Sequence, residues 1–121
     1  MESAKPELYL SMATHNSVRA VNAGKGIAYN IRVELEHPNA PQFSVKNCAH
    51  HIMRPAECIF IEFKRARSKF NARLLGTQLY IKVKYDGLYE KDLSQRLEIT
   101  DKVEFPKHPV FPEKCKETVV L

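Results

Sequence analysis

The sequence predicts one all-β domain of seven strands, because hydrophobic and polar residues alternate, turn residues recur and helical spacing is rare. The alternation is clearest over 28–36, 57–64 and 78–85. A period of two places the two sets of side chains on opposite faces of a strand. Seven short strands with regular turns indicate a sandwich or a barrel. The chain has 121 residues, which is the length of one domain.

Each strand follows from its local pattern. Leu8, Leu10 and Met12 alternate near the N-terminus, and Asp101 interrupts the last alternating run, which indicates a bulge or a strand end. The seven expected strands cover 8–12, 18–22, 28–36, 44–49, 57–64, 78–85 and 97–105. The centre of the core is expected to consist of Tyr29, Ile31, Val33, Leu35, Ile59, Ile61, Phe63, Leu79, Ile81 and Val83.

Two segments depart from this pattern. Ala66, Phe70 and Leu74 are four residues apart and Gly76 follows them, so a short helix is expected over 65–75. Prolines recur in the last stretch of the chain. They predict an extended C-terminal tail over 106–121, which leaves 1–105 as the domain itself.

Gly24-Lys25-Gly26 is interpreted as a hairpin turn in which the glycines supply positive φ. A phosphate-binding loop is the competing interpretation. That loop requires an earlier glycine, a Ser or Thr after the Gly-Lys pair, and a following helix. Here residue 26 is glycine and a strand follows, which favours the turn.

The residues around this turn resemble a pattern found in immunoglobulin-like modules. Val21 and Asn22 end one strand, the Gly-x-Gly turn follows, and Ala28 and Asn30 begin the next strand. The segment 54–57 is similar to the Pro-Gly-Glu that often precedes the fifth strand of such modules, with alanine in place of glycine. The resemblance, to sandwich domains of adhesion-related and uncharacterised prokaryotic proteins, implies an immunoglobulin-like sandwich that binds other proteins or acts as a spacer. A fold does not by itself fix a function.

The cysteines are expected to be free thiols. Cys48, Cys58 and Cys115 are odd in number, and their spacing fits no disulfide framework. The N-terminus has no apolar signal segment, and no run approaches the roughly 20 apolar residues of a membrane span, so a reducing cytoplasm is the expected location. His50 and His51 add one short Cys-x-His pair, whereas a structural zinc site needs four ligands. We therefore expect no metal and no cofactor.

No catalytic constellation is recognisable in the sequence. No nucleophile lies in a pattern such as Gly-x-Ser-x-Gly. Outward carboxylates lie beside outward basic residues, which indicates cross-strand pairing on a solvated sheet. These residues are Glu34, Glu98, Glu104, Arg32, Lys82, Lys84 and Lys102. We therefore expect a non-enzymatic module with no small-molecule substrate.

The expected function is protein binding, through outward residues of two strands. Alternation directs Tyr9, Phe60 and Glu62 away from the core. The immunoglobulin topology places their strands in one sheet, where a contiguous apolar patch indicates an interface. The expected partner is another protein or a second copy of the chain.

The alternative function is nucleic-acid binding through the segment 64–73. Five of its ten residues are basic and none is acidic, in a chain of formal net charge +5. Its cations are able to neutralise phosphates, and Phe70 is able to stack on a base. The competing interpretation makes Phe70 a core anchor and the charges a solvated surface. The cations concerned are Lys64, Arg65, Arg67, Lys69 and Arg73.

Overall fold

The structure is a computed structural model that describes residues 4–14, 16–38, 44–63, 79–99, 115 and 117–121, with the side chains of 48–50 excepted. This part of the chain is all-β and contains no helix. Its strands are β1 (Leu8–Thr14), β2 (Ser17–Asn22), β3 (Ala28–Glu36), β4 (Val45–Met53), β5 (Cys58–Glu62), β6 (Tyr80–Asp86), β7 (Leu93–Glu98) and β8 (Glu117–Val120).

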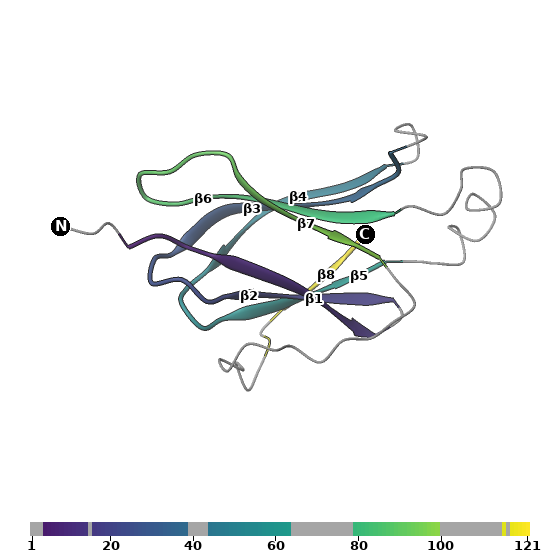
Figure 1. The fold of residues 1–121 in the computed structure, drawn as a ribbon, viewed down its shortest axis with the longest axis horizontal. Coiled ribbons are helices and arrows are strands. Elements are labelled where there is room, and N and C mark those ends of the chain that lie inside the picture. The colour runs from purple at the N-terminus through teal and green to yellow at the C-terminus, as the bar shows by residue number, and fades with distance from the viewer. Residues whose placement is uncertain (1–3, 15, 39–43, 64–78, 100–114, 116) are drawn as a thin grey trace.

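The strands form two sheets that lie one above the other in Figure 1. One sheet has the order β1-β2-β5-β8 and the other β4-β3-β6-β7. Neighbouring strands are antiparallel, except that β8 runs parallel to β5. The chain changes sheet between β2 and β3, so the Gly24-Lys25-Gly26 turn joins two layers and is not the hairpin that the sequence predicted.

The hydrophobic core lies between the two sheets and receives side chains from both. Val18, Ile61 and Val119 come from one sheet, and Val33 and Ile81 come from the other. All five are at most 2% exposed. Of the ten residues predicted for the core centre, eight are buried, and Leu79 is half-buried against them.

Tyr29 is the predicted core residue that the structure places differently. It is half-buried, and Ala28 takes the fully buried position beside it. The cause is Asn30, whose φ of 51° lies in the left-handed region. The register of β3 shifts there against both β4 and β6. A bulge adds one residue to the strand, so the alternation before Ile31 is reversed.

Most predicted strands are confirmed, although the bounds of two of them differ clearly from the prediction. The fourth strand extends to Met53, and β7 begins at Leu93 instead of residue 97. The predicted helix over 65–75 lies outside the described residues, as does most of the predicted tail. Residues 117–120 of that tail form β8, which pairs with β5 and contributes Val119 to the core.

The turn between β2 and β3 depends on Asn22, which is fully buried. Its Nδ2 donates hydrogen bonds to the carbonyls of Gly26 (2.9 Å) and Met53 (3.0 Å). Its Oδ1 accepts hydrogen bonds from the amides of Gly24 (3.1 Å) and Glu7 (3.3 Å). One side chain thus pairs with four backbone groups in three segments, which would otherwise bury unpaired polar groups.

The two glycines of this turn are required by close packing rather than by φ. Neither has a left-handed φ, which corrects the prediction of positive φ. A Cβ atom on Gly24 would collide with the carbonyl oxygen of Lys5, and one on Gly26 with that of Ala4. The turn therefore holds the N-terminal segment in place by accepting its backbone at close range.

Candidate binding surfaces

The outward face of the β1-β2-β5-β8 sheet carries mainly uncharged side chains. We call it the apolar face and define it by Tyr9, Val21, Phe60, Thr118 and Val120. The register sets Tyr9 opposite Val21, and Phe60 opposite Thr118. The side chains of Tyr9 and Val120 remain accessible, since these residues are 48% and 57% exposed. These strands therefore display apolar side chains to solvent.

The three residues predicted from sequence for a protein interface lie on this same face. Tyr9 is on β1, and Phe60 and Glu62 are on β5, with β2 between the two strands. Phe60 is partly covered by the Arg19 guanidinium, whose carbon lies 5.3 Å from the ring centroid. Glu62 is exposed and pairs in register with Val120. The apolar face thus also carries one cation and one carboxylate, on its two inner strands β2 and β5.

The residues predicted for nucleic-acid contact lie outside the described part of the chain. They are Lys64, Arg65, Arg67, Lys69 and Arg73, in the stretch 64–78. The structure therefore gives no geometry for that prediction.

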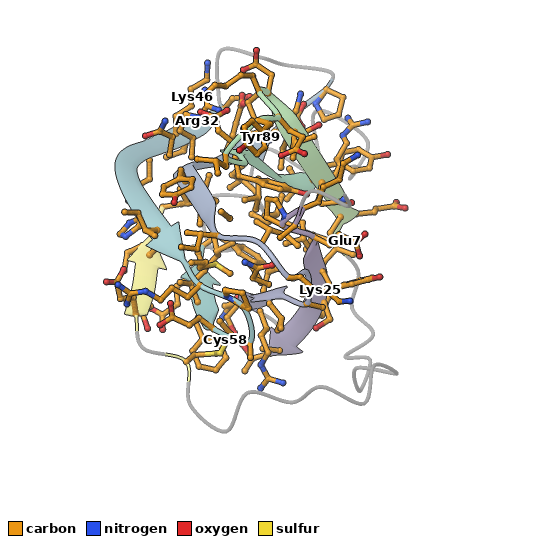
Figure 2. All side chains as sticks on the ribbon, turned by 90° about the vertical axis from the view of Figure 1, so that its left-hand side faces the viewer. Glu7, Lys25, Arg32, Lys46, Cys58 and Tyr89 are labelled. Atoms are coloured by element: carbon orange, nitrogen blue, oxygen red, sulfur yellow. A yellow bond between two sulfur atoms is a disulfide. The ribbon has the colours of Figure 1, made fainter. Side chains whose placement is uncertain are left out.

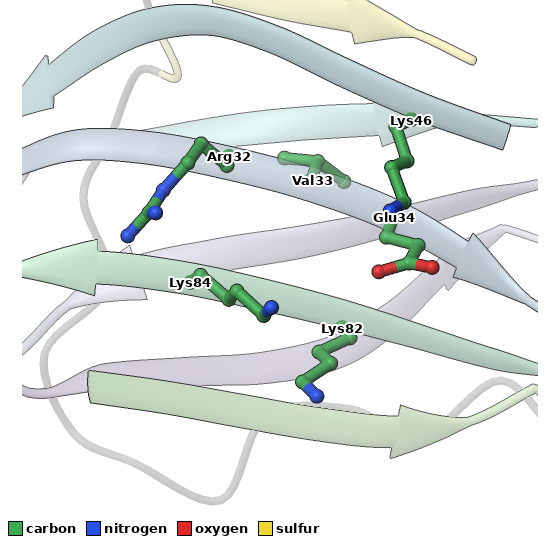
Figure 3. A pocket seen from close by; sticks show the side chains of 6 residues that line it. All are labelled: Arg32, Val33, Glu34, Lys46, Lys82 and Lys84. Atoms are coloured by element: carbon green, nitrogen blue, oxygen red, sulfur yellow. The ribbon is translucent and has the colours of Figure 1, made fainter. Parts of the chain in front are cut away.

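The outward face of the β4-β3-β6-β7 sheet is strongly charged and contains a hollow that sequence reasoning missed. Figure 2 shows Arg32 and Lys46 on the opposite side of the molecule from Cys58 of the apolar face's sheet. The hollow measures about 140 Å³. Arg32, Val33, Glu34, Lys46, Lys82 and Lys84 line it (Figure 3), and we call it the cationic hollow.

The strand order brings these charges together. Arg32 and Glu34 are on β3, and their direct partners on β6 are Lys84 and Lys82. Lys46 on β4 faces Glu34 from the other side. Glu34 and Lys82 are thus opposite each other, as the predicted cross-strand pairing requires, but they form no ion pair, and Arg32 lies opposite a like charge. Alternation in the sequence predicts that these charged residues point outward. Only the strand order β4-β3-β6 shows that they lie next to one another.

Arg32 is held at the end of the hollow near the β6–β7 connection. Its Nη2 lies 3.6 Å from Asp86 Oδ1 and 3.9 Å from Asp92 Oδ1, without a hydrogen bond. Asp86 also accepts hydrogen bonds from Asn30 Nδ2 (3.0 Å) and from the amide of Asp92 (3.0 Å). The Asn30 bond, then the Asp92 bond and the Arg32 charge, hold the pKa of Asp86 below its usual value despite its burial.

Two cysteines are bonded to each other, so the prediction that both are free thiols is wrong. A disulfide joins Cys58 to Cys115, whose Cα atoms are 4.6 Å apart. The spacing of the cysteines did not predict this disulfide, because the two residues are 57 positions apart and only the pairing of β8 with β5 brings them together. Nearby, His51 Nδ1 lies 2.7 Å from Glu117 Oε2 and connects β4 to β8 across the two sheets.

The described residues include no group of three or more His, Cys, Asp or Glu side chains arranged to hold a metal ion. In the same residues, no helix is long and apolar enough to cross a membrane. Comparisons with models of protein families, with curated proteins and with solved structures found no match.

Proposed function

We propose that the chain is a non-enzymatic binding module whose apolar face contacts another protein. The observation that carries this proposal is the difference between the two outward faces. One presents Tyr9, Val21, Phe60 and Val120, whereas the other presents mostly charged side chains. Exposed aromatic and aliphatic side chains gathered on one surface are typical of protein interfaces.

The strand arrangement supports an immunoglobulin-like module. In immunoglobulin domains the first, second and fifth strands share one sheet, and the third, sixth and seventh share the other. Here β1, β2 and β5 are separated from β3, β6 and β7 in the same way. The fourth strand pairs with β3, and β8 is added beside β5. Such domains commonly bind through their exposed faces, which agrees with the proposed role of the apolar face.

The disulfide supports an oxidising compartment instead of the reducing cytoplasm expected from the sequence. Disulfides persist in secreted, periplasmic and extracellular proteins and are rare in reducing compartments. Alkylation of free thiols during lysis of the native cell distinguishes the two locations. A protected Cys58–Cys115 pair is the expected result.

The test of protein binding uses a photo-crosslinking residue on each face. Ser11 lies on β1 opposite Arg19, and Ser94 lies on β7 opposite Lys84. We expect protein adducts from position 11 and not from position 94 in the native cell, and we expect them to survive nuclease. An adduct of twice the chain mass identifies a second copy as the partner.

Matched variants connect these adducts to the apolar face. Tyr9→Glu with Val120→Glu is expected to abolish them, because two charges then require desolvation at the interface. Tyr89→Glu with Ile52→Glu is the control, since Tyr89 and Ile52 are 76% and 58% exposed elsewhere. Equal adducts from both faces, or equal loss in both variant pairs, would contradict the proposal. Adducts that disappear with nuclease would favour the nucleic-acid alternative.

A further inference from the structure

We propose that the cationic hollow binds a phosphate group, held by Lys46, Lys82 and Lys84. This site is separate from the apolar face and lies on the other sheet. Its ligand class is a phosphate monoester, which carries up to two negative charges on three accessible oxygens.

The charge balance of the hollow is the first argument. Four cations and one carboxylate line it, and they come from three neighbouring strands. Arg32 is engaged by Asp86 and Asp92, but Lys46, Lys82 and Lys84 form no ion pair with a carboxylate among the described residues. Like charges opposite each other destabilise a sheet, and Arg32 and Lys84 are such a pair. A bound anion offsets this repulsion.

The placement of the ammonium groups is the second argument. Figure 3 shows Lys46 reaching toward Glu34 from β4 and Lys84 on the other side, on β6, while the Lys82 ammonium group and the Arg32 guanidinium extend away from Glu34. Ammonium groups that reach one hollow from different strands are suited to a ligand with several oxygens. A lysine binds phosphate as a point charge, and its flexible stem permits this convergence.

The size of the hollow is the third argument. Its volume of about 140 Å³ compares with about 30 Å³ for a water molecule in the liquid. Sites for drug-sized ligands measure about 300–1,000 Å³. The hollow therefore accommodates one anionic group with a few waters, and the rest of a phosphorylated ligand extends into solvent. The phosphate belongs either to a soluble molecule or to a lipid headgroup.

The experiment titrates the folded chain with inorganic phosphate and follows backbone amide chemical shifts. Sodium chloride at the same ionic strength is the reference. We expect saturable shifts on β3, β4 and β6, around Glu34, Lys46 and Lys82. Lys82→Gln with Lys84→Gln is expected to weaken binding on the order of tenfold or more, because each removes a charged donor. Both changes lie on the sheet surface, so the fold is expected to persist.

Two matched controls separate this site from a general effect of net charge. Lys5→Gln with Lys25→Gln removes the same charge from exposed positions and is expected to leave the affinity within about twofold. Glu34→Gln removes the carboxylate of the hollow and is expected to tighten binding severalfold, whereas Glu62→Gln on the other sheet has no such effect. Equal losses in both lysine pairs, or no gain in Glu34→Gln, would overturn the proposal.

Vesicles distinguish the two sources of the phosphate. Neutral vesicles with and without phosphatidic acid are sedimented with the chain. Sedimentation that requires phosphatidic acid, and that Lys82→Gln with Lys84→Gln abolishes, identifies a lipid headgroup. Saturable binding of inorganic phosphate without sedimentation identifies a soluble ligand. Absence of binding in both arms rejects the site.

Discussion

At the scale of single residues, a few non-glycine residues have a positive φ, which the alternation of hydrophobic and polar residues does not predict. Ala56 has a φ of 67° just before β5, where the resembling motif has glycine. Its amide donates a hydrogen bond to the Asn22 carbonyl (2.8 Å), and the Glu57 amide donates to the Arg54 carbonyl (3.1 Å). These bonds fix a turn whose left-handed residue carries a Cβ atom. A glycine at this position would avoid that steric cost.

Ala56→Gly is therefore expected to stabilise the protein. Removal of the Cβ atom relieves about 1–2 kcal/mol of left-handed strain, and the greater entropy of the unfolded glycine chain offsets part of it. The net gain in unfolding free energy is about 0.5–1 kcal/mol, measured by urea denaturation. Ala13→Gly in β1 is the control and is expected to destabilise by a similar amount. A loss of stability in Ala56→Gly would contradict the conformation assigned to this turn.

At the scale of elements, one carboxylate connects the β3 bulge with the β6–β7 connection. Asp86 ends β6, accepts hydrogen bonds from Asn30 and from the Asp92 amide, and lies beside Arg32. Asp92 also has a positive φ, of 56°. Because Asn30 is the residue that reverses the alternation of β3, its bond to Asp86 stabilises the bulge and positions the strand that carries the cationic hollow.

This arrangement predicts a loss of stability in acid. The folded-state pKa of Asp86 lies below its usual value of 3.8, so the carboxylate contributes stability above about pH 5. That contribution is lost as the pH falls through 3.8 toward the folded-state pKa. Urea midpoints measured from pH 6 to pH 2.5 are expected to show a gap between the native chain and Asp86→Asn that narrows in acid. A gap that stays constant would exclude this role for the carboxylate.

At the scale of the whole molecule, β8 holds the end of the chain against both layers. It pairs with β5, buries Val119, and is linked to β4 through the 2.7 Å contact between His51 and Glu117. The Cys58–Cys115 disulfide fixes the start of this attachment. A four-residue edge strand provides few hydrogen bonds of its own, so the covalent link largely determines whether β8 remains attached.

Removal of this link by Cys115→Ser is expected to lower the unfolding free energy by about 4 kcal/mol. The bridge closes a loop of 57 residues, and constraint of the unfolded chain by a loop of that length predicts this value. Amide hydrogen exchange is expected to accelerate most over 117–121. Reductant should destabilise the native chain and leave Cys115→Ser unchanged. If reductant has no effect on the native chain, the disulfide does not contribute to its stability.

The sequence by itself determined where most of the strands lie and which of their side chains face the core, although it did not predict β8. Alternation predicts that Ile31, Ile61 and Ile81 face the interior, because a period of two is a local property of the chain, and all three are buried. The same alternation directed Tyr9 and Phe60 outward, and both lie on the apolar face.

The tertiary structure decided which strands are neighbours, and therefore what the outward residues do together. Lys46 and Lys82 lie opposite Glu34 on either side only because β4 and β6 both pair with β3. Cys58 and Cys115 meet only because β8 returns to β5. Alternation describes one strand at a time, whereas pairing joins segments distant in sequence through the packing of the whole chain. Strand pairing also explains why Tyr29 is not in the core as predicted. The bulge at Asn30 that displaces Tyr29 is stabilised by a hydrogen bond from Asn30 to Asp86 on β6.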